Sequence, residues 1–148
     1  MMLAGAAGGG LAVGLMYLLS VQSAFPLASV PFATSIVLVT GTPDAAPAQP
    51  RALVGGHILS AIVGLVALKL VGPQPWVAAM AVSVAMLLML MTGSFHPPAG
   101  IKPLIIVSNA MPWTYVLVPV TAGAAILLAY TWAWTNFVRR SHWPQRWW

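Results

Sequence analysis

The chain has 148 residues, of which 60% are hydrophobic and 5% are charged, and its formal net charge is +5. Soluble domains carry roughly a quarter charged residues, so this composition excludes a soluble protein and indicates a membrane protein. The chain contains no cysteine, which excludes disulfides and thiolate metal sites. Because a spanning helix needs about 20 apolar residues, we predict an all-α membrane protein with about four transmembrane helices.

The first predicted span covers residues 1–20. No basic segment precedes its apolar run, so we interpret it as a span rather than a cleaved signal peptide. Ala6, Gly10 and Gly14 follow one another at intervals of four residues. This spacing makes a stripe of small residues that another helix can approach closely, and it predicts close helix packing.

A short apolar run from Pro31 to Gly41 comes next. It is too short to cross a bilayer as a helix, and a proline at its start with a glycine at its end suits a short helix. We therefore predict a half-helix that enters the membrane, with Thr34 and Ser35 near its N-terminal end. A full span that begins near Pro26 is the competing interpretation.

The second predicted span covers residues 51–71 and follows a proline-rich loop. Gly56, Ser60 and Gly64 again lie four residues apart, which predicts a face for tight packing. His57 lies beside that face. A single histidine in a helix is more often part of a hydrogen-bonded structure than a ligand, and both interpretations stay open here.

The third predicted span, residues 76–92, carries several methionines, which we interpret as adaptable packing rather than as copper ligands. It leads into residues 95–103, where a histidine, a lysine, three prolines and a glycine occur together. A membrane tolerates irregular backbone and ionisable groups only where they are buried in protein or line a wet cavity. This stretch is therefore the predicted functional centre of the chain.

The last predicted span covers residues 113–137, where Pro119 should produce a bend. It completes a single transmembrane domain, residues 1–138, and a basic, tryptophan-rich tail follows at residues 139–148. Positive residues favour the cytoplasmic side, so we expect a multi-pass protein of the cell inner (plasma) membrane with a cytoplasmic C-terminus. In the loop before residue 51, Asp44 either pairs with Arg51 or is solvated.

The two halves of the chain share a layout, in which a long span, a short proline-led run and a proline-containing loop precede a second span. Short apolar segments at matching positions of two halves are a sequence indicator of a transport site. We therefore predict two short broken or re-entrant half-helices arranged as an internal repeat. If both re-enter from one side, both termini are cytoplasmic; if both cross, the repeats are inverted.

The predicted site favours a small anion. Helix N-termini present free N–H groups and a positive dipole end. Lys102 adds a charge that depends on its protonation, because burial lowers the pKa of a lysine, and His96 can donate a hydrogen bond or relay a proton. A cation pathway would use carboxylates or a ring of carbonyls, and the region has no acid. The predicted substrate-binding residues are His96, Pro97, Pro98, Gly100, Lys102, Thr34, Ser35 and His57.

Two alternatives to an anion transporter or channel stay open: a membrane scaffold or subunit without transport activity, and a metal-ion permease. Broken segments count against a scaffold, which has no use for exposed backbone at membrane depth. We expect no enzyme, since no catalytic spacing occurs, and no metal, cofactor or nucleic-acid partner. Four short spans enclose little volume, so we expect a homo-oligomer in the lipid bilayer.

The sequence His96-Pro97-Pro98-Ala99-Gly100 resembles the HPP family of integral membrane proteins, which is named for this tripeptide. Residues 31–38, 49–57, 103–105 and 136–140 are similar to the family as well, so the resemblance covers nearly the whole chain.

The HPP family is described as having four transmembrane helices. Its plant chloroplast and cyanobacterial members are associated with nitrite transport, so the resemblance implies nitrite as the anion. Lys102 departs from the pattern, since a small or neutral polar residue is expected there. This departure implies a difference in the substrate or in how its charge is balanced.

Overall fold

The computed structural model describes residues 2–147, and the regular structure in this range is helical throughout. Three short helical turns lie in the loops or lead into helices, at Ala46–Ala48, Arg51–Gly55 and Pro97–Ile101. Two π-helical turns flank the last helix, at Val116–Thr121 and Trp134–Val138. The α-helices are α1 (Met2–Ser23), α2 (Val30–Gly41), α3 (Gly56–Val71), α4 (Pro75–Thr92), α5 (Lys102–Ser108) and α6 (Ala122–Ala133).

Four continuous helical segments are long and apolar enough to cross a membrane, which confirms the predicted fold class. Large apolar side chains are exposed along them, including Leu18, Leu70, Met91 and Leu117. A lipid bilayer solvates such surfaces, whereas monomeric soluble proteins rarely expose them over a wide area. The four segments are Met2–Ser23, Arg51–Val71, Pro75–Thr92 and Val116–Val138.

Hydrogen bonds show which helix ends lie together. Trp134 Nε1 donates to the carbonyl of Ala4 over 3.1 Å, and Arg139 Nη1 donates to the carbonyl of Thr40 over 2.6 Å. The start of α1, the end of α2 and the end of the α6 segment therefore share one end of the molecule. We call it the arginine end, because Arg139, its neighbour Arg140, and the pocket-lining Arg51 and Arg146 lie there.

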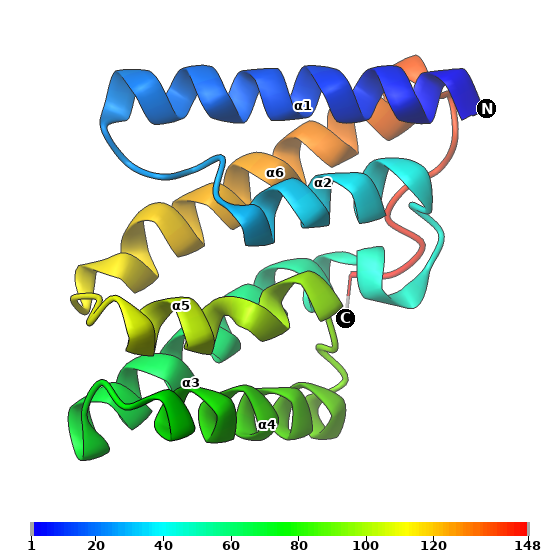
Figure 1. Cartoon of the computed structure of the whole chain (residues 1–148). Helices are drawn as coiled ribbons and strands as arrows, with labels where there is room; N and C mark the ends of the chain where they lie inside the picture. The colour runs from blue at the N-terminus through cyan, green and yellow to red at the C-terminus, as the bar shows by residue number, and fades with distance from the viewer. Residues whose placement is uncertain (1, 148) are drawn as a thin grey trace.

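The two halves of the chain run in opposite directions (Figure 1). The first half leaves the arginine end along α1, returns through the segment that ends in α2, and leaves again along α3. The second half approaches that end along α4, leaves along α5, and approaches again along α6. Both short runs thus cross between the two ends, and the internal repeat is the inverted alternative of the two that the sequence leaves open.

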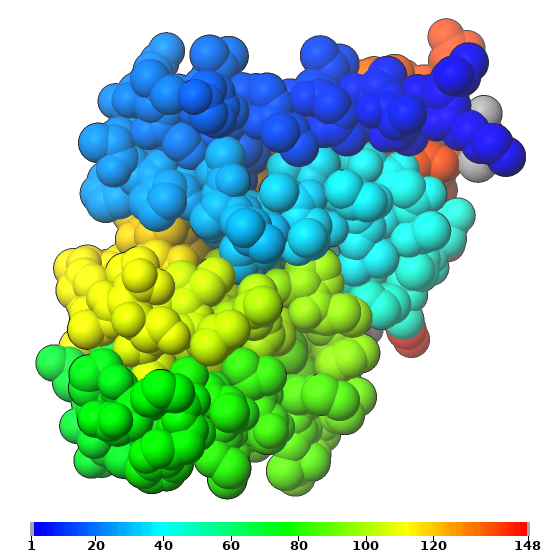
Figure 2. Space-filling model, viewed as in Figure 1, coloured from blue at the N-terminus to red at the C-terminus, as the bar shows by residue number. Residues whose placement is uncertain are grey.

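Each half-helix begins inside the molecule rather than at its edge. In Figure 1, α2 starts beneath the middle of α1, after a loop at residues 24–29 has entered from the far end. The start of α5 lies beside the middle of α3, where Ser60 Oγ donates to the carbonyl of Ala99 over 2.7 Å. Figure 2 shows α5 filling the space between α2 and α4. Because both half-helices begin inside the molecule, the short polar segments at their N-terminal ends lie at the centre of the fold.

Small residues on α3 allow this central packing, as their spacing predicts. A Cβ added at Gly56 would lie 2.8 Å from the Cβ of His96, and one at Gly64 would lie 2.8 Å from the Cα of Pro103. Such distances are shorter than real Cβ contacts, so only glycine permits the approach. The predicted packing face of α3 is therefore confirmed, and its partner is the segment from residue 94 to residue 106.

The predicted packing stripe of α1 is wrong within the chain. Ala6, Gly10 and Gly14 are exposed, and a Cβ added at Gly10 or Gly14 would meet no atom within 4 Å. The buried face of α1 instead includes Gly8 and Ala12. Because α1 is apolar on every side, its composition does not indicate which side turns inward.

Pro119 interrupts the last span, as the sequence predicts. Val118 has an extended backbone, and the segment bends there before α6 begins. Beyond the bend, Gly123 lies against the ring of Phe32, where an added Cβ would come within 2.7 Å of the ring. The bend and the glycine together allow α6 to pack closely on α2.

Candidate functional site

Four polar side chains meet at the centre of the fold: Ser35, His57, His96 and Lys102, which we call the central cluster. Each has no exposed surface, at 0% relative accessibility. They come from α2, from the first turn of α3, from the loop before Pro97–Ile101 and from the start of α5. The two inverted halves contribute two residues each, so the cluster lies on the junction between them.

Hydrogen bonds join three of the four side chains. Ser35 Oγ lies 2.9 Å from His57 Nε2 and 2.8 Å from His96 Nε2. The other ring nitrogen of His96, Nδ1, lies 2.7 Å from the carbonyl oxygen of Pro47. Ser35 Oγ is also 2.7 Å from the carbonyl oxygen of Pro31 in its own helix. The hydroxyl of Ser35 thus bridges two histidines from opposite halves of the chain.

Phe32 lies against both Lys102 and His57. Its ring stacks on the ring of His57 with centroids 4.6 Å apart, and Lys102 Nζ lies 4.2 Å from the centroid of the same Phe32 ring. Within the part of the chain that the structure describes, Lys102 Nζ and His57 Nδ1 are buried atoms without a hydrogen-bond partner. Buried polar groups nearly always have partners, so two unpartnered atoms in one cluster make the central cluster the candidate functional site.

Among residues 2–147, no carboxylate balances Lys102. The one acid of the chain is Asp44, whose Oδ1 accepts a hydrogen bond from Gln145 Nε2 over 3.1 Å in an exposed position at the arginine end. Arg51 donates to the carbonyl of Thr92, so the pair between Asp44 and Arg51 considered from the sequence is not seen. A buried charge without a partner is costly, so the charged form of Lys102 needs a counterion that the described residues do not supply.

The remaining predicted site residues lie around the cluster rather than in it. Pro97 is exposed, while Pro98 and Gly100 are partly buried, and all three shape the turn Pro97–Ile101 that leads into α5. Thr34 is exposed, and its hydroxyl donates to carbonyls of its own helix. Thr34 therefore faces away from Ser35, because neighbouring residues of a helix point about 100° apart.

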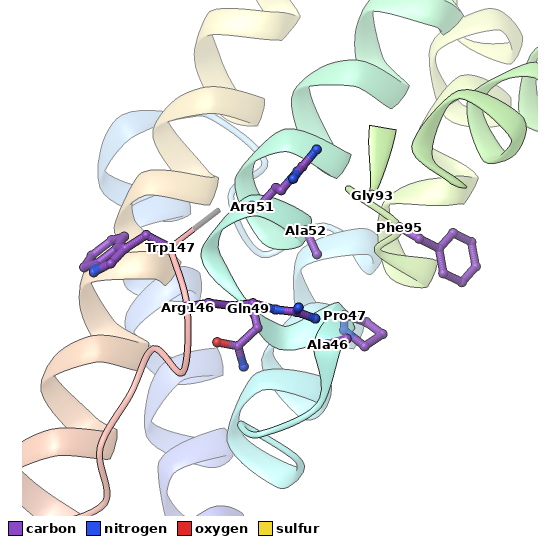
Figure 3. Close-up of a pocket in the computed structure, with 9 residues that line it drawn as sticks. All are labelled: Ala46, Pro47, Gln49, Arg51, Ala52, Gly93, Phe95, Arg146 and Trp147. Carbon is purple, nitrogen blue, oxygen red and sulfur yellow. The ribbon is translucent and has the colours of Figure 1, made fainter. Parts of the chain in front are cut away.

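A cavity of about 390 Å³ lies at the arginine end (Figure 3). Arg51, from the start of the second span, and Arg146, from the C-terminal tail, both line it, and we call it the basic pocket. Pro47 lines the same pocket, and its carbonyl accepts the hydrogen bond from His96. His57 comes six residues after Arg51, which places it about 9 Å deeper along the helix.

Sequence reasoning missed Phe32, Pro47 and Arg146. Phe32 lies three residues before Ser35 in α2, so helical spacing alone places both on one face. Pro47 and Arg146 had no such signal. They reach the site because Gln49 Oε1 accepts from the backbone N–H of Gln145 over 2.9 Å, which fixes the tail beside the loop.

This geometry does not support the alternative of a metal-ion permease. The central cluster offers two imidazoles, and within residues 2–147 there is no group of three or more histidine, cysteine or acidic side chains that could hold a metal ion. A lysine ammonium in the same cluster would repel a metal cation. The arrangement instead suits an acceptor-rich, negatively charged species.

Comparisons with known proteins agree with the membrane assignment. The HPP transmembrane region, as a family, matches residues 1–144. Two transmembrane proteins of Dictyostelium discoideum are 41% and 44% identical over 125 residues, which is 79% of this chain in each case. The chain spans less than half of the length of these relatives, 44% and 40% respectively. No solved structure matches the chain.

Proposed function

The chain belongs to the HPP family of membrane proteins, and we propose that it transports a small inorganic anion, nitrite in particular, through the central cluster. The observation that carries this proposal is the ammonium of Lys102, which is fully buried and has neither a carboxylate nor a hydrogen-bond partner within the described residues. An anion from solution supplies both the missing charge and the missing acceptor.

The basic pocket supports an anion route. Arg51 and Arg146 raise the local concentration of anions at its mouth, because a cleft lined by one sign of charge focuses the field. Pro47 lines the pocket, and its carbonyl accepts the hydrogen bond from His96 of the cluster. An anion therefore meets positive charge at the mouth and again at Lys102, without passing an acidic side chain.

The inverted repeat also supports transport over a scaffold. Transporters of several classes place their substrate sites near the membrane midplane, between inverted repeats with discontinuous helices. Here the start of α2 and the start of α5 meet at the cluster. A scaffold or a subunit without transport activity would gain nothing from burying a lysine there, since a packed apolar residue is less costly.

Nitrite as the anion follows from the family resemblance. A small planar anion presents oxygen acceptors to Lys102 without requiring a large cavity. The departure at Lys102 places a formal charge in the cluster, which suits an anion that binds without its own counterion. We further propose that the arginine end is cytoplasmic by the positive-inside rule, and that the subunits form a homo-oligomer in the inner membrane.

The experiment that tests the proposed function is nitrite uptake into proteoliposomes, with protein-free liposomes as the blank. We expect saturable uptake above the blank that nitrate or formate reduces by competition. Uptake equal to the blank for all three anions would refute the anion transporter and leave the scaffold as the better interpretation.

A further inference from the structure

The hydroxyl of Ser35 contacts more possible hydrogen-bond acceptors than it has hydrogens to donate. It carries one hydrogen and lies within 2.9 Å of three acceptor-capable atoms: the carbonyl oxygen of Pro31 and the Nε2 atoms of His57 and His96. Two of these contacts must therefore be accepted by Ser35 Oγ or remain without a hydrogen. The protonation of the two histidines decides which contact receives the hydrogen.

The carbonyl of Pro47 fixes one histidine tautomer. A carbonyl only accepts, so His96 Nδ1, 2.7 Å away, carries a hydrogen. In neutral His96, Nε2 is then a bare acceptor, and it competes with the Pro31 carbonyl for the one hydrogen that Ser35 can donate. Ser35 Oγ in turn accepts from His57 Nε2, which must carry a hydrogen. Neutral His57 therefore has its bare lone pair on Nδ1, the atom that has no partner among residues 2–147.

This order of hydrogen bonds creates a conflict for an anion. Lys102 Nζ is an unpartnered donor, whereas His57 Nδ1 is an unpartnered acceptor, and both side chains contact the ring of Phe32. The oxygens of an anion are acceptors too, so the lone pair on His57 would repel an anion held by Lys102. A proton on His57 Nδ1 changes that acceptor into a donor and removes the repulsion.

We propose that the chain His57–Ser35–His96 binds one proton with each anion, so that transport is proton-coupled and electrically neutral. This inference rests on the proposed function. With one proton for each anion, the loaded cluster carries the same net charge as the empty cluster. The cost of burying charge then does not change between the loaded and the empty states.

The proton can move from His57 to His96 through the hydroxyl of Ser35, along the existing hydrogen bonds. After Nδ1 of His57 takes up a proton, His57 Nε2 gives its hydrogen to Ser35 Oγ, and Ser35 gives its own hydrogen to His96 Nε2. The positive charge is then on His96, and His57 is neutral with its hydrogen on Nδ1. Release toward the basic pocket requires the hydrogen bond between His96 Nδ1 and Pro47 to open.

Few other ionisable groups lie near the hydrogen-bonded residues His57, Ser35 and His96. Lys102 is the ionisable residue of α5. The ring of Tyr115, which precedes Val116–Thr121, lies 6.0 Å from Lys102 Nζ. The helix α4 has no ionisable side chain. On α6, Tyr130 donates to the carbonyl of Gly8 and so points toward α1. A proton at the cluster therefore resides on the two histidines or on Lys102.

The closing experiment compares two driving forces on nitrite uptake into proteoliposomes. A gradient of one pH unit, acidic outside, and a membrane potential of about 60 mV each supply about 1.4 kcal/mol for one charge, which corresponds to a tenfold accumulation. We expect the pH gradient to raise nitrite accumulation toward tenfold above protein-free liposomes, and we expect the potential to change it by less than twofold. Accumulation that follows the potential and ignores the pH gradient would overturn the coupling and uphold anion transport, whereas no uptake would overturn both.

The variant His57→Gln gives a sharper result. Glutamine keeps an N–H that can donate to Ser35 Oγ but cannot take up a proton. We expect the remaining uptake to follow the potential instead of the pH gradient. His142→Gln is the matched control, since His142 is exposed in the tail, and it should behave like the wild type. Coupling that survives in His57→Gln would overturn the assignment of the proton to this chain.

A second readout does not depend on transport or on a variant. Nitrogen-15 NMR of the histidine rings in bilayers should show opposite tautomers for His57 and His96 at high pH, with hydrogens on Nε2 and Nδ1 respectively. Adding nitrite should protonate both nitrogens of one ring. Equal tautomers, or no change on adding nitrite, would overturn the proposal.

Discussion

Replacing Lys102 with methionine tests whether the buried ammonium serves an anion or the fold. The side chain has no exposed surface, and its Nζ has no hydrogen-bond partner in the part of the chain that is described. Its one close favourable contact is the ring of Phe32, with the centroid 4.2 Å away. Methionine has a similar length and is apolar, so it can occupy the same space without an unpaired charge.

The expected change in stability follows from two opposing effects. A buried donor without a partner costs about 1–3 kcal/mol, and more when it is charged. The cation–π contact with Phe32 stabilises the fold by about 0.5–2 kcal/mol. The free energy of unfolding of Lys102→Met should therefore lie between about 1 kcal/mol below and about 2.5 kcal/mol above that of the wild type. Nitrite, however, loses a charged hydrogen bond that contributes about 1.5–3 kcal/mol, or about 10- to 150-fold in affinity.

The assay combines thermal unfolding in detergent, with and without nitrite, and uptake into proteoliposomes. The wild type should gain melting temperature when nitrite is added, since a ligand that binds the folded state stabilises it. Lys102→Met should lose both this gain and most of the uptake. Lys69→Met is the control, because Lys69 is exposed near the end of α3, and it should match the wild type. A variant Lys102→Met that is less stable by more than about 2 kcal/mol, with normal nitrite uptake, would show that Lys102 is structural.

Two further predictions concern the packing and the mouth of the site. Gly56→Ala should destabilise the fold by about 1–3 kcal/mol, because the new Cβ would overpack against His96. Gly10→Ala should be neutral or slightly stabilising, because an added Cβ there meets no atom. Unfolding followed by circular dichroism distinguishes the two variants, and equal effects on stability would contradict the packing argument. Arg146→Gln should raise the KM for nitrite several-fold at low ionic strength, and the effect should fade at high salt because ions screen the field of the basic pocket. Arg140→Gln should change neither the KM for nitrite nor its salt dependence, since Arg140 lies outside the pocket. An effect of Arg146→Gln on the KM that does not depend on salt would contradict the electrostatic role.

The helices could be predicted from the sequence because a bilayer imposes their length. Apolar runs of about 20 residues have one main use in a protein, and shorter runs between prolines have few. The position of the site was also accessible, since His96 and Lys102 are ionisable groups in an apolar segment. What the sequence could not provide was the direction of each short run, because a run that crosses and one that re-enters have the same composition.

The inward face of each helix was the less predictable part. In a soluble helix the polar side identifies the surface, but lipid-facing and buried sides of α1 are equally apolar, and the stripe at Ala6, Gly10 and Gly14 therefore gave the wrong face. In α2 two neighbouring hydroxyl residues were both predicted to bind the substrate, but only one can face the interior. Ser35 faces inward and contacts both histidines, so Thr34, its neighbour in the helix, faces outward.

The surroundings of Lys102 differ on its two sides, and this difference bears on how an anion would cross. Toward the arginine end, the cluster reaches the basic pocket through His96 and Pro47. Toward the far end, one turn along α5, it is covered by buried apolar side chains that include Ile106 and Tyr115. Under the proposed function, a site with a polar contact toward one side and an apolar cover on the other suits one of the two states of alternating access. Because the two halves are inverted, an exchange of their conformations would open the far side and seal the arginine end around the same lysine.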